Sequence, residues 1–411
     1  MSLSFAANTT KAKSLKATES ISSRLPFLDR TRGLIMIFMA LDHCLFFWSS
    51  GRINNEGLPL LINGAVTFNP LGVSSALALI VMFLSSICAP GFLFIAGYVL
   101  ALSLKKRELK GISSSSISHH LWRRGMLLIV FQVFIASPAF NLPMFIQVKS
   151  LSIVTWGTFF SLSVLSTIGI GFFFLSFGRH ISPWKLFGIS GLLYLFSQLL
   201  LPGFTRSYPF HLAIEQAWQA ILVLPVPFSP GSLVNNNFPV IPWLFPMALG
   251  WLYGHTYDEQ RGIAYEARRF AVTGFSSLAL FFIFRFAGIG DYLLPDGTFQ
   301  GFFGLSKYPP SPDYFLLYLG LVFLSFFLFY KLPQTSRIGE ILEDFGRVPL
   351  FFYNTHLWLY AAVPALLSNF NGYSLTFGVA IWLLGLLILY PLCHGYLVHG
   401  SRLARRKSLF N

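Results

Sequence analysis

Long continuous blocks of apolar residues, separated by short polar stretches, run through most of this chain. A helix that crosses the hydrocarbon core of a bilayer needs about 20 such residues. The blocks are too long and too continuous for the alternating pattern of a membrane β-barrel. They predict ten membrane-spanning helices, at residues 32–50, 78–103, 124–140, 156–176, 184–202, 239–256, 269–288, 313–331, 347–367 and 374–398.

The stretch at residues 211–226 is ambiguous, because it holds His211 and Glu215 among apolar residues. Lys and Arg concentrate in the cytoplasmic loops of membrane proteins. The basic clusters of this chain all fall on one side only if residues 203–238 stay outside. A full extra span would move the arginines at 261–269 to the outer side. We therefore expect a re-entrant or interfacial helix here, and both termini in the cytoplasm.

Composition supports a membrane protein. The chain is 55% hydrophobic and 11% charged, whereas about 25% of the residues in soluble domains are charged. Only helices and closed barrels satisfy their backbone within lipid, so we predict an all-α, polytopic integral membrane protein. The net charge of +14 would suggest a nucleic-acid partner in a soluble protein. Here the basic residues lie mainly in short loops, so we expect the bilayer and no nucleic acid.

The chain divides into three parts by composition. Residues 1–24 are polar and predict a disordered cytoplasmic tail, residues 25–400 form the transmembrane domain, and residues 401–411 form a basic cytoplasmic tail. The three cysteines all lie within apolar segments. They predict neither a disulfide framework nor a metal site.

Two ionisable residues, Asp42 and His43, lie next to each other within the first predicted span. Ionisable groups inside a membrane are costly, and their presence favours a functional role. Histidine also gains or loses a proton near neutral pH. The pair therefore predicts proton or acyl chemistry at a membrane-buried site. Neighbouring residues on a helix point in different directions, so Asp42 contacts either His43 or another helix.

A second histidine, His356, lies within the ninth predicted span. With a rise of about 1.5 Å per residue, His43 lies roughly 16 Å beyond Arg32 along the first span, and His356 lies roughly 14 Å inside its own span. This spacing allows the two imidazoles to meet near the middle of the membrane. Tyr353 and Asn354, beside His356, either line a polar cavity with it or join helices by hydrogen bonds.

Charged residues near the cytoplasmic ends of the spans are candidates for binding an anionic donor. Asp29 and Arg32 are three residues apart and predict an ion pair on one helix, which either anchors the helix or holds an anionic group. Arg123 and Arg124, with the basic run 105–107, predict contacts with lipid headgroups. The same cluster would bind a phosphorylated donor that arrives from the cytoplasm.

Two further basic residues are candidate ligands. Lys307 lies in a loop predicted on the outer side, where positive-inside topology does not require a charge. We therefore expect it to contact a ligand or an acceptor. Arg347 begins the ninth span at its cytoplasmic end, and it joins the candidate donor-binding residues.

Several segments of this chain, taken together and in order, resemble bacterial membrane proteins that carry the heparan-α-glucosaminide N-acetyltransferase catalytic domain, a family of transmembrane acyltransferases. The matching segments span residues 25 to 400: LDRTRG at 28–33, MALDH at 39–43, CAPGFLFIAG at 88–97, RRG at 123–125, IPW at 241–243, MALG at 247–250, KYPPS at 307–311 and GRVPLFFYNTH at 346–356. Bacterial relatives often carry Thr-His before the Cys-Ala-Pro, where this chain has Ser86 and Ile87.

The resemblance implies transfer of an acetyl or longer acyl group from cytoplasmic acetyl-CoA to a sugar amine or hydroxyl on the far side of the membrane, with no metal. It also implies that His43 is the active-site histidine. His43 then acts either as general base on the acceptor or as a nucleophile that forms an acetyl-imidazole. Asp42 or a carboxylate of another helix would orient the ring. Arg32 or Asn354 would stabilise the oxyanion of the thioester.

Two other classes of function fit the same pattern. Ten spans with buried Asp and His residues also describe a transporter or a proton-coupled permease, although the chain has no internal repeat and no paired broken helices. A non-catalytic membrane scaffold would tolerate loss of both His43 and His356. The acceptor of an acyltransferase is left open between a cell-envelope glycan and a lipid-linked sugar. The resemblance allows a homodimer in a bacterial inner membrane.

Overall fold

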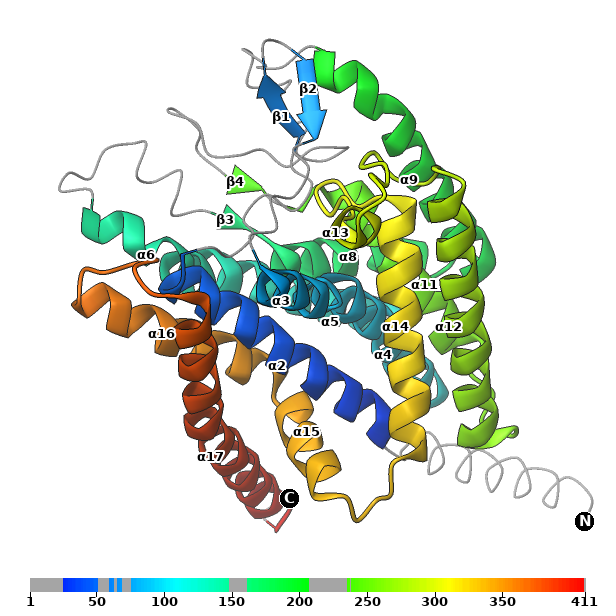
Figure 1. Ribbon diagram of the computed structural model, residues 1–411. Coiled ribbons are helices and arrows are strands. Elements are labelled where there is room, and N and C mark those ends of the chain that lie inside the picture. The colour runs from blue at the N-terminus through cyan, green and yellow to red at the C-terminus, as the bar shows by residue number, and fades with distance from the viewer. Residues whose placement is uncertain are drawn as a thin grey trace, which may run out of the picture.

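The computed structural model of this protein describes residues 25–50, 59–62, 65–68, 75–147, 161–206, 235–236 and 238–409. These residues form a helical bundle with a few short strands (Figure 1). The predicted all-α class is therefore confirmed.

The first half of the chain supplies the helices from α2 to α9. Helix α2 starts at Pro26, where the missing N–H of a proline has no cost because the first helical residues lack a partner in any case. Helices α3 and α4 follow one another with a break at Ile87. The bounds are α2 Pro26–Trp48, α3 Ala76–Ser86, α4 Cys88–Leu109, α5 Ser114–Phe131, the π-helix η1 Gln132–Ala136, α6 Ser137–Gln147, α8 Val164–Gly178 and α9 Pro183–Arg206.

The second half adds α11 Val240–His255, α12 Gly262–Phe286, α13 Phe299–Phe303, α14 Pro312–Lys331, α15 Arg337–Arg347, α16 Pro349–Leu366 and α17 Leu375–Leu409. Helices α12 and α14 stand side by side in Figure 1 and pack on each other. Strands β1 (Pro59–Ile62) and β2 (Ala65–Phe68) form an antiparallel hairpin, and β3 (Ser161–Leu162) pairs with β4 (Asn235–Asn236) in parallel.

Six helical segments of the described chain are long and apolar enough to cross a membrane: Pro26–Trp48, Ala76–Leu109, Ser114–Leu142, Gly262–Phe286, Pro312–Lys331 and Leu375–Gly400. Every one of the ten predicted spans overlaps a helix, and the number of ten stays a prediction. The predicted tail at 1–24 and the predicted re-entrant segment at 211–226 lie outside the described residues. The basic stretch after residue 400 continues α17 as far as Leu409.

Helix α2 lies at the centre of the bundle and packs on α4, α14, α15, α16 and α17. Its approach to α15 is very close, because a Cβ on Gly33 would collide with the carbonyl of Leu342. Helix α15 was not predicted from the sequence. It is a short amphipathic helix with Glu343 on its polar side, and its charges were interpreted as a cytoplasmic loop.

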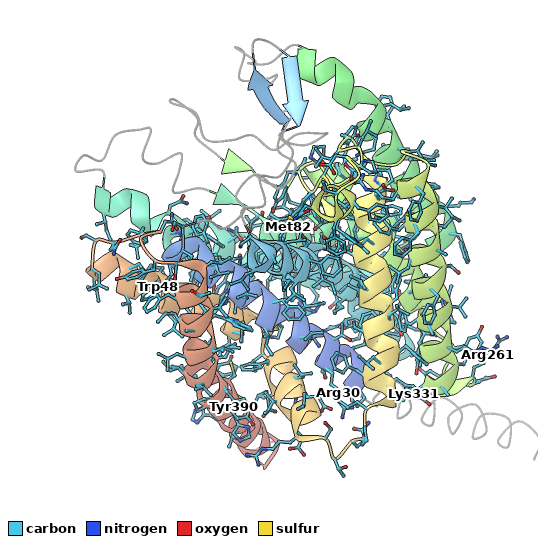
Figure 2. The ribbon with its side chains drawn as sticks, in the orientation of Figure 1. Arg30, Trp48, Met82, Arg261, Lys331 and Tyr390 are labelled. Atoms are coloured by element: carbon cyan, nitrogen blue, oxygen red, sulfur yellow. The ribbon has the colours of Figure 1, made fainter. Side chains whose placement is uncertain are left out.

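Arg30 fastens the start of α2 to the segment that links α14 and α15. Its guanidinium is fully buried and pairs with Glu343 at 2.8 Å. It also donates to the carbonyls of Phe329 and Leu332, at 3.2 and 2.8 Å. In Figure 2, Arg30 lies close to Lys331 at the lower edge of the bundle, with Arg261 on the same side, whereas Met82 lies at the upper side. These three basic residues thus lie toward one end of the bundle, and the predicted sidedness of the membrane topology stays a prediction.

The loop between α12 and α14 carries Lys307 and is held by buried charges. Arg285 donates to the carbonyl of Phe302 at 2.8 Å and to the carbonyl of Gly304 at 3.1 Å. Asp291 accepts the N–H of Ser306 at 3.1 Å and also the hydroxyl of Ser311. Burial raises the pKa of Asp291 to about 6. These contacts fix the path of the chain just before and after Lys307.

Candidate active site

A cavity of about 690 Å³ lies between α2, α4, α5, α8 and α16, and the loop before α14 closes part of it. Much of its wall is apolar. The side chains of α4, α5 and α8 contribute Phe92, Ile95, Val99, Leu127, Ile168 and Phe172. Five of the residues predicted from the sequence line the same cavity: Arg32, Asp42, His43, Arg124 and Lys307.

His43 and His356 meet, as the spacing of the sequence allowed. Nδ1 of His43 lies 2.8 Å from Nε2 of His356, and the two rings are nearly parallel, with 11° between their planes. His43 lines the cavity and is partly exposed, whereas His356 is fully buried behind it. Nδ1 of His356 lies 2.8 Å from the carbonyl oxygen of Phe352.

The packing of α2 on α16 holds this pair in place. Nε1 of Trp48 donates to the carbonyl of Tyr360 at 3.0 Å, and the hydroxyl of Tyr360 donates to the carbonyl of Trp382 on α17 at 2.9 Å. His43 lies five residues before Trp48, the last residue of α2, which is roughly 8 Å along the helix. The histidine pair is therefore nearer the C-terminal end of α2 than its middle.

Asp42 lines the cavity beside His43. The hydrogen-bond partner that the structure gives to Nδ1 of His43 is His356. A second imidazole therefore orients the ring through Nδ1, and the predicted orienting role of Asp42 stays a prediction. The aromatic side chain of Phe140 lies edge-on to His43, with 4.8 Å between the ring centres, and it limits rotation of the ring.

Two arginines line the cavity away from the histidines. Arg32 pairs with Asp29 on the same face of α2, as predicted. Arg124 lies over the ring of Phe172, 5.5 Å from its centre, and is exposed. Helix α5 begins at Ser114, so Arg124 lies roughly 15 Å along it. Arg124 therefore lies well inside α5, whereas the sequence predicted it at the first residue of the span 124–140.

Lys307 lines the cavity in the loop before α14. Its side chain is only 6% exposed, and its ammonium group lies 5.3 Å from the centre of the Tyr308 ring. Phe238 packs edge-on against Tyr308, with 5.4 Å between ring centres. A cation over an aromatic ring is favoured by the negative face of that ring, so this part of the wall combines a positive charge with a flat aromatic surface.

Five predicted site residues do not line the cavity: His356 lies behind it, and Asp29, Arg123, Arg347 and Asn354 are not part of its wall. Arg123 and Arg347 are exposed, and neither lines the cavity. Asn354 donates to the carbonyl of Leu350 at 3.0 Å, and its side-chain oxygen is buried without a hydrogen-bond partner in the part of the chain that is described. Tyr353, the preceding residue, lines the cavity in its place. It lies three residues before His356, on the same face of α16.

A polar group from α6 and the start of α8 was missed by the sequence reasoning. Asn141 and Ser163 line the cavity, and the hydroxyl of Ser163 donates to the side-chain oxygen of Gln132 at 2.8 Å. Gln132 is fully buried and begins the π-helix η1. Single turns of π-helix are frequent at functional sites, but nothing in the residue pattern of this segment distinguishes such a turn from an ordinary apolar span.

No cluster of three or more His, Cys, Asp or Glu side chains suited to a metal ion occurs in the ranges that the structure describes. Among known families, the model described as heparan-alpha-glucosaminide N-acetyltransferase, catalytic, matches residues 65–286, more than half of the chain. The matched range includes Arg124, Asn141 and Ser163, whereas His43 and His356 lie outside it. The search of curated proteins returns no match.

Proposed function

The chain belongs to the family of heparan-alpha-glucosaminide N-acetyltransferase catalytic domains, and from this premise we propose that it transfers an acetyl group from cytoplasmic acetyl-CoA to a sugar or glycan on the outer side, with His43 at the reacting centre. The family is one of membrane acetyltransferases, and the apolar helices of this chain agree with a membrane protein. The proposal adds the donor, the acceptor and the residues.

One observation carries the proposal: a single cavity is lined by two arginines, a buried lysine and His43, which is bonded to the buried His356 behind it. Arg32 and His43 lie on the same helix, 11 residues apart, which is roughly 16 Å. In acetyl-CoA the thioester is separated from the phosphates by the extended pantetheine arm. A donor whose phosphates bind near Arg32 would thus direct its thioester along α2 toward His43.

Arg32 and Arg124 are the proposed contacts of the donor phosphates. Guanidinium groups bind phosphate oxygens through paired N–H donors, which makes arginine well suited to this task. The cavity that Arg124 and His43 share has many apolar side chains of α4, α5 and α8 in its wall. Such a wall excludes water from the thioester and strengthens the electrostatic interactions within the site.

The chemistry at His43 follows one of two routes. As a general base, His43 takes the proton of the acceptor hydroxyl or amine while the new bond to the acetyl carbon forms and the C–S bond breaks; the proton then passes to the leaving thiolate. As a nucleophile, His43 forms an acetyl-imidazole and releases CoA before the acceptor arrives. Tyr353, which lines the cavity with its ring centre 6.3 Å from that of His43, is the proposed donor to the thioester oxyanion.

Lys307 and Tyr308 are the proposed acceptor contacts. Both line the cavity in the loop before α14, on the side of the bundle away from Arg30 and Lys331. The flat ring of Tyr308 suits the face of a sugar, and the ammonium group of Lys307 suits a phosphate or carboxylate on a lipid-linked or envelope glycan.

Release of CoA thiol from acetyl-CoA by the purified protein tests the proposal. We expect His43→Ala to abolish release, with or without added acceptor glycans, while His255→Ala on α11 retains it. His255 packs on Trp251, with 4.4 Å between ring centres, and does not line the cavity. Undiminished release by His43→Ala would remove His43 from the mechanism. Accumulation of a solute by proteoliposomes that contain no acyl donor would favour a transporter.

A further inference from the structure

The hydrogen bonds of the two histidines determine which ring nitrogen of His43 can react. Nδ1 of His356 lies 2.8 Å from the carbonyl oxygen of Phe352. A carbonyl oxygen only accepts hydrogen bonds, so Nδ1 of His356 carries the proton of that bond. This contact assigns one proton of the pair without any assumption about the reaction.

The charge state of His356 fixes the second proton. His356 is fully buried, and it lies within a helix of a membrane protein, where an uncompensated cation is costly. It is therefore neutral, with its single proton on Nδ1 and a lone pair on Nε2. Nε2 lies 2.8 Å from Nδ1 of His43. A short contact between two ring nitrogens requires one donor, so Nδ1 of His43 donates this hydrogen bond.

We propose that His356 is a positioning residue that holds His43 in the Nδ1-protonated tautomer, so that Nε2 of His43 is the nitrogen that reacts. The assignment of the reacting nitrogen rests on the acetyltransferase function proposed above. The tautomer itself rests on the two hydrogen bonds and on the neutral state of the buried His356. The carbonyl of Phe352 in α16 thus fixes the position of the proton on His356, and His356 in turn fixes the position of the proton on His43.

The hydrogen bond between His43 and His356 also stabilises the positive charge that forms on His43 during transfer. The proton of the acceptor hydroxyl or amine passes to Nε2 of His43 as the acceptor bonds to the acetyl carbon and the C–S bond breaks. His43 is then an imidazolium, whose Nδ1–H stays bonded to the lone pair of His356. The leaving thiolate takes the proton from Nε2, which yields CoA thiol and returns His43 to its neutral form. The same role is played by a carboxylate in the Ser-His-Asp triad.

The substitutions His356→Leu and His356→Gln separate the role of the hydrogen bond from the role of packing. Leucine fills the space but accepts no hydrogen bond, whereas a glutamine amide retains one acceptor and a donor. We expect kcat to fall about 10²-fold in His356→Leu, the lower end of the range for general-base catalysis, because a wrongly oriented His43 no longer acts efficiently as the base. The kcat of His356→Gln should be at least tenfold higher than that of His356→Leu. The KM for acetyl-CoA should stay within threefold, since His356 does not line the cavity. The control His255→Leu should keep the kcat of the wild-type protein.

The protonation of His43 is measured directly by ¹⁵N NMR of protein labelled at its nine histidines, with the signals of His43 assigned by their loss in His43→Asn. We expect Nδ1 protonated and Nε2 unprotonated in the wild-type protein, and loss of that preference in His356→Leu. Protonated Nε2 with unprotonated Nδ1 in the wild-type protein would overturn the proposal, even if acetyl transfer is confirmed. The expected tautomer in a protein without transferase activity would instead overturn only the proposed function. Equal kcat values for His356→Leu and the wild-type protein would also overturn the positioning role.

Discussion

Arg124→Ala tests the donor end of the cavity. Arg124 lines the cavity over the ring of Phe172, and its guanidinium would contact a phosphate of acetyl-CoA. A hydrogen bond to a charged group is worth about 1.5–3 kcal/mol. Because Arg124 is exposed and water screens it, we take the lower end of this range. The change should therefore weaken acetyl-CoA binding about tenfold.

Arg123→Ala is the matched control for this prediction. Arg123 precedes Arg124, is also exposed and does not line the cavity. The control removes the same charge from the same turn of α5. We expect the dissociation constant for CoA, measured by equilibrium dialysis in detergent, to change by less than about twofold, as for most surface charges. Raised salt should reduce the difference between the two variants, since exposed charges are screened. Equal weakening by both changes would refute the donor role of Arg124 and leave only an effect of net charge.

Three further predictions follow from other parts of the structure. Burial raises the pKa of Asp291 to about 6, above the value of about 4 for an exposed aspartate, so the folded protein binds a proton that the unfolded chain releases. Protonated Asp291 therefore contributes its full stabilisation below about pH 4, and up to about 3 kcal/mol of stability is lost as the pH rises through about 6. In thermal melts at a series of pH values, the Tm of the wild-type protein should fall over this range and the Tm of Asp291→Asn should not. An identical pH dependence of Tm in the two proteins would contradict the prediction. Arg30→Met leaves Glu343 and two carbonyls without their donor. It should lower the free energy of unfolding by about 3 kcal/mol, as for other broken buried pairs, which appears as a lower Tm. Arg261→Met, which breaks an exposed pair, is the control, and equal Tm values for the two variants would contradict a stabilising role of Arg30. Cys88 lines the cavity, so saturating acetyl-CoA should slow its alkylation by a maleimide in a protein without the other two cysteines; an unchanged rate would mean that the donor binds elsewhere.

Sequence reasoning located correctly the ionisable residues, because placing an ionisable side chain inside a membrane has a high free-energy cost. His43 and His356 stand in apolar blocks at similar distances from basic residues, and the depth of each along its helix showed, before the packing was known, that they could meet. Arg32 and Asp29 paired as their spacing predicts. In these cases a strong physical constraint acts on single residues, and no knowledge of the packing is needed.

The details that sequence reasoning did not give depend on helix rotation and packing. Tyr353 and Asn354 are neighbours with similar polarity, and only the rotation of α16 decides that Tyr353 faces the cavity. Arg124 was predicted at the start of a span, because the charge pattern does not show that α5 begins ten residues earlier, at Ser114. Helix α15 was missed because its charged residues resemble those of a cytoplasmic loop. In the structure it packs closely on Gly33 of α2 and forms an ion pair with Arg30.

A structure of the protein with bound acetyl-CoA tests the central claim most directly. The account predicts that the phosphates lie at Arg32 and Arg124, and that the thioester carbon lies about 3.5 Å from Nε2 of His43, as in a complex ready to react. A donor bound outside this cavity, or one whose thioester points away from His43, would contradict the account.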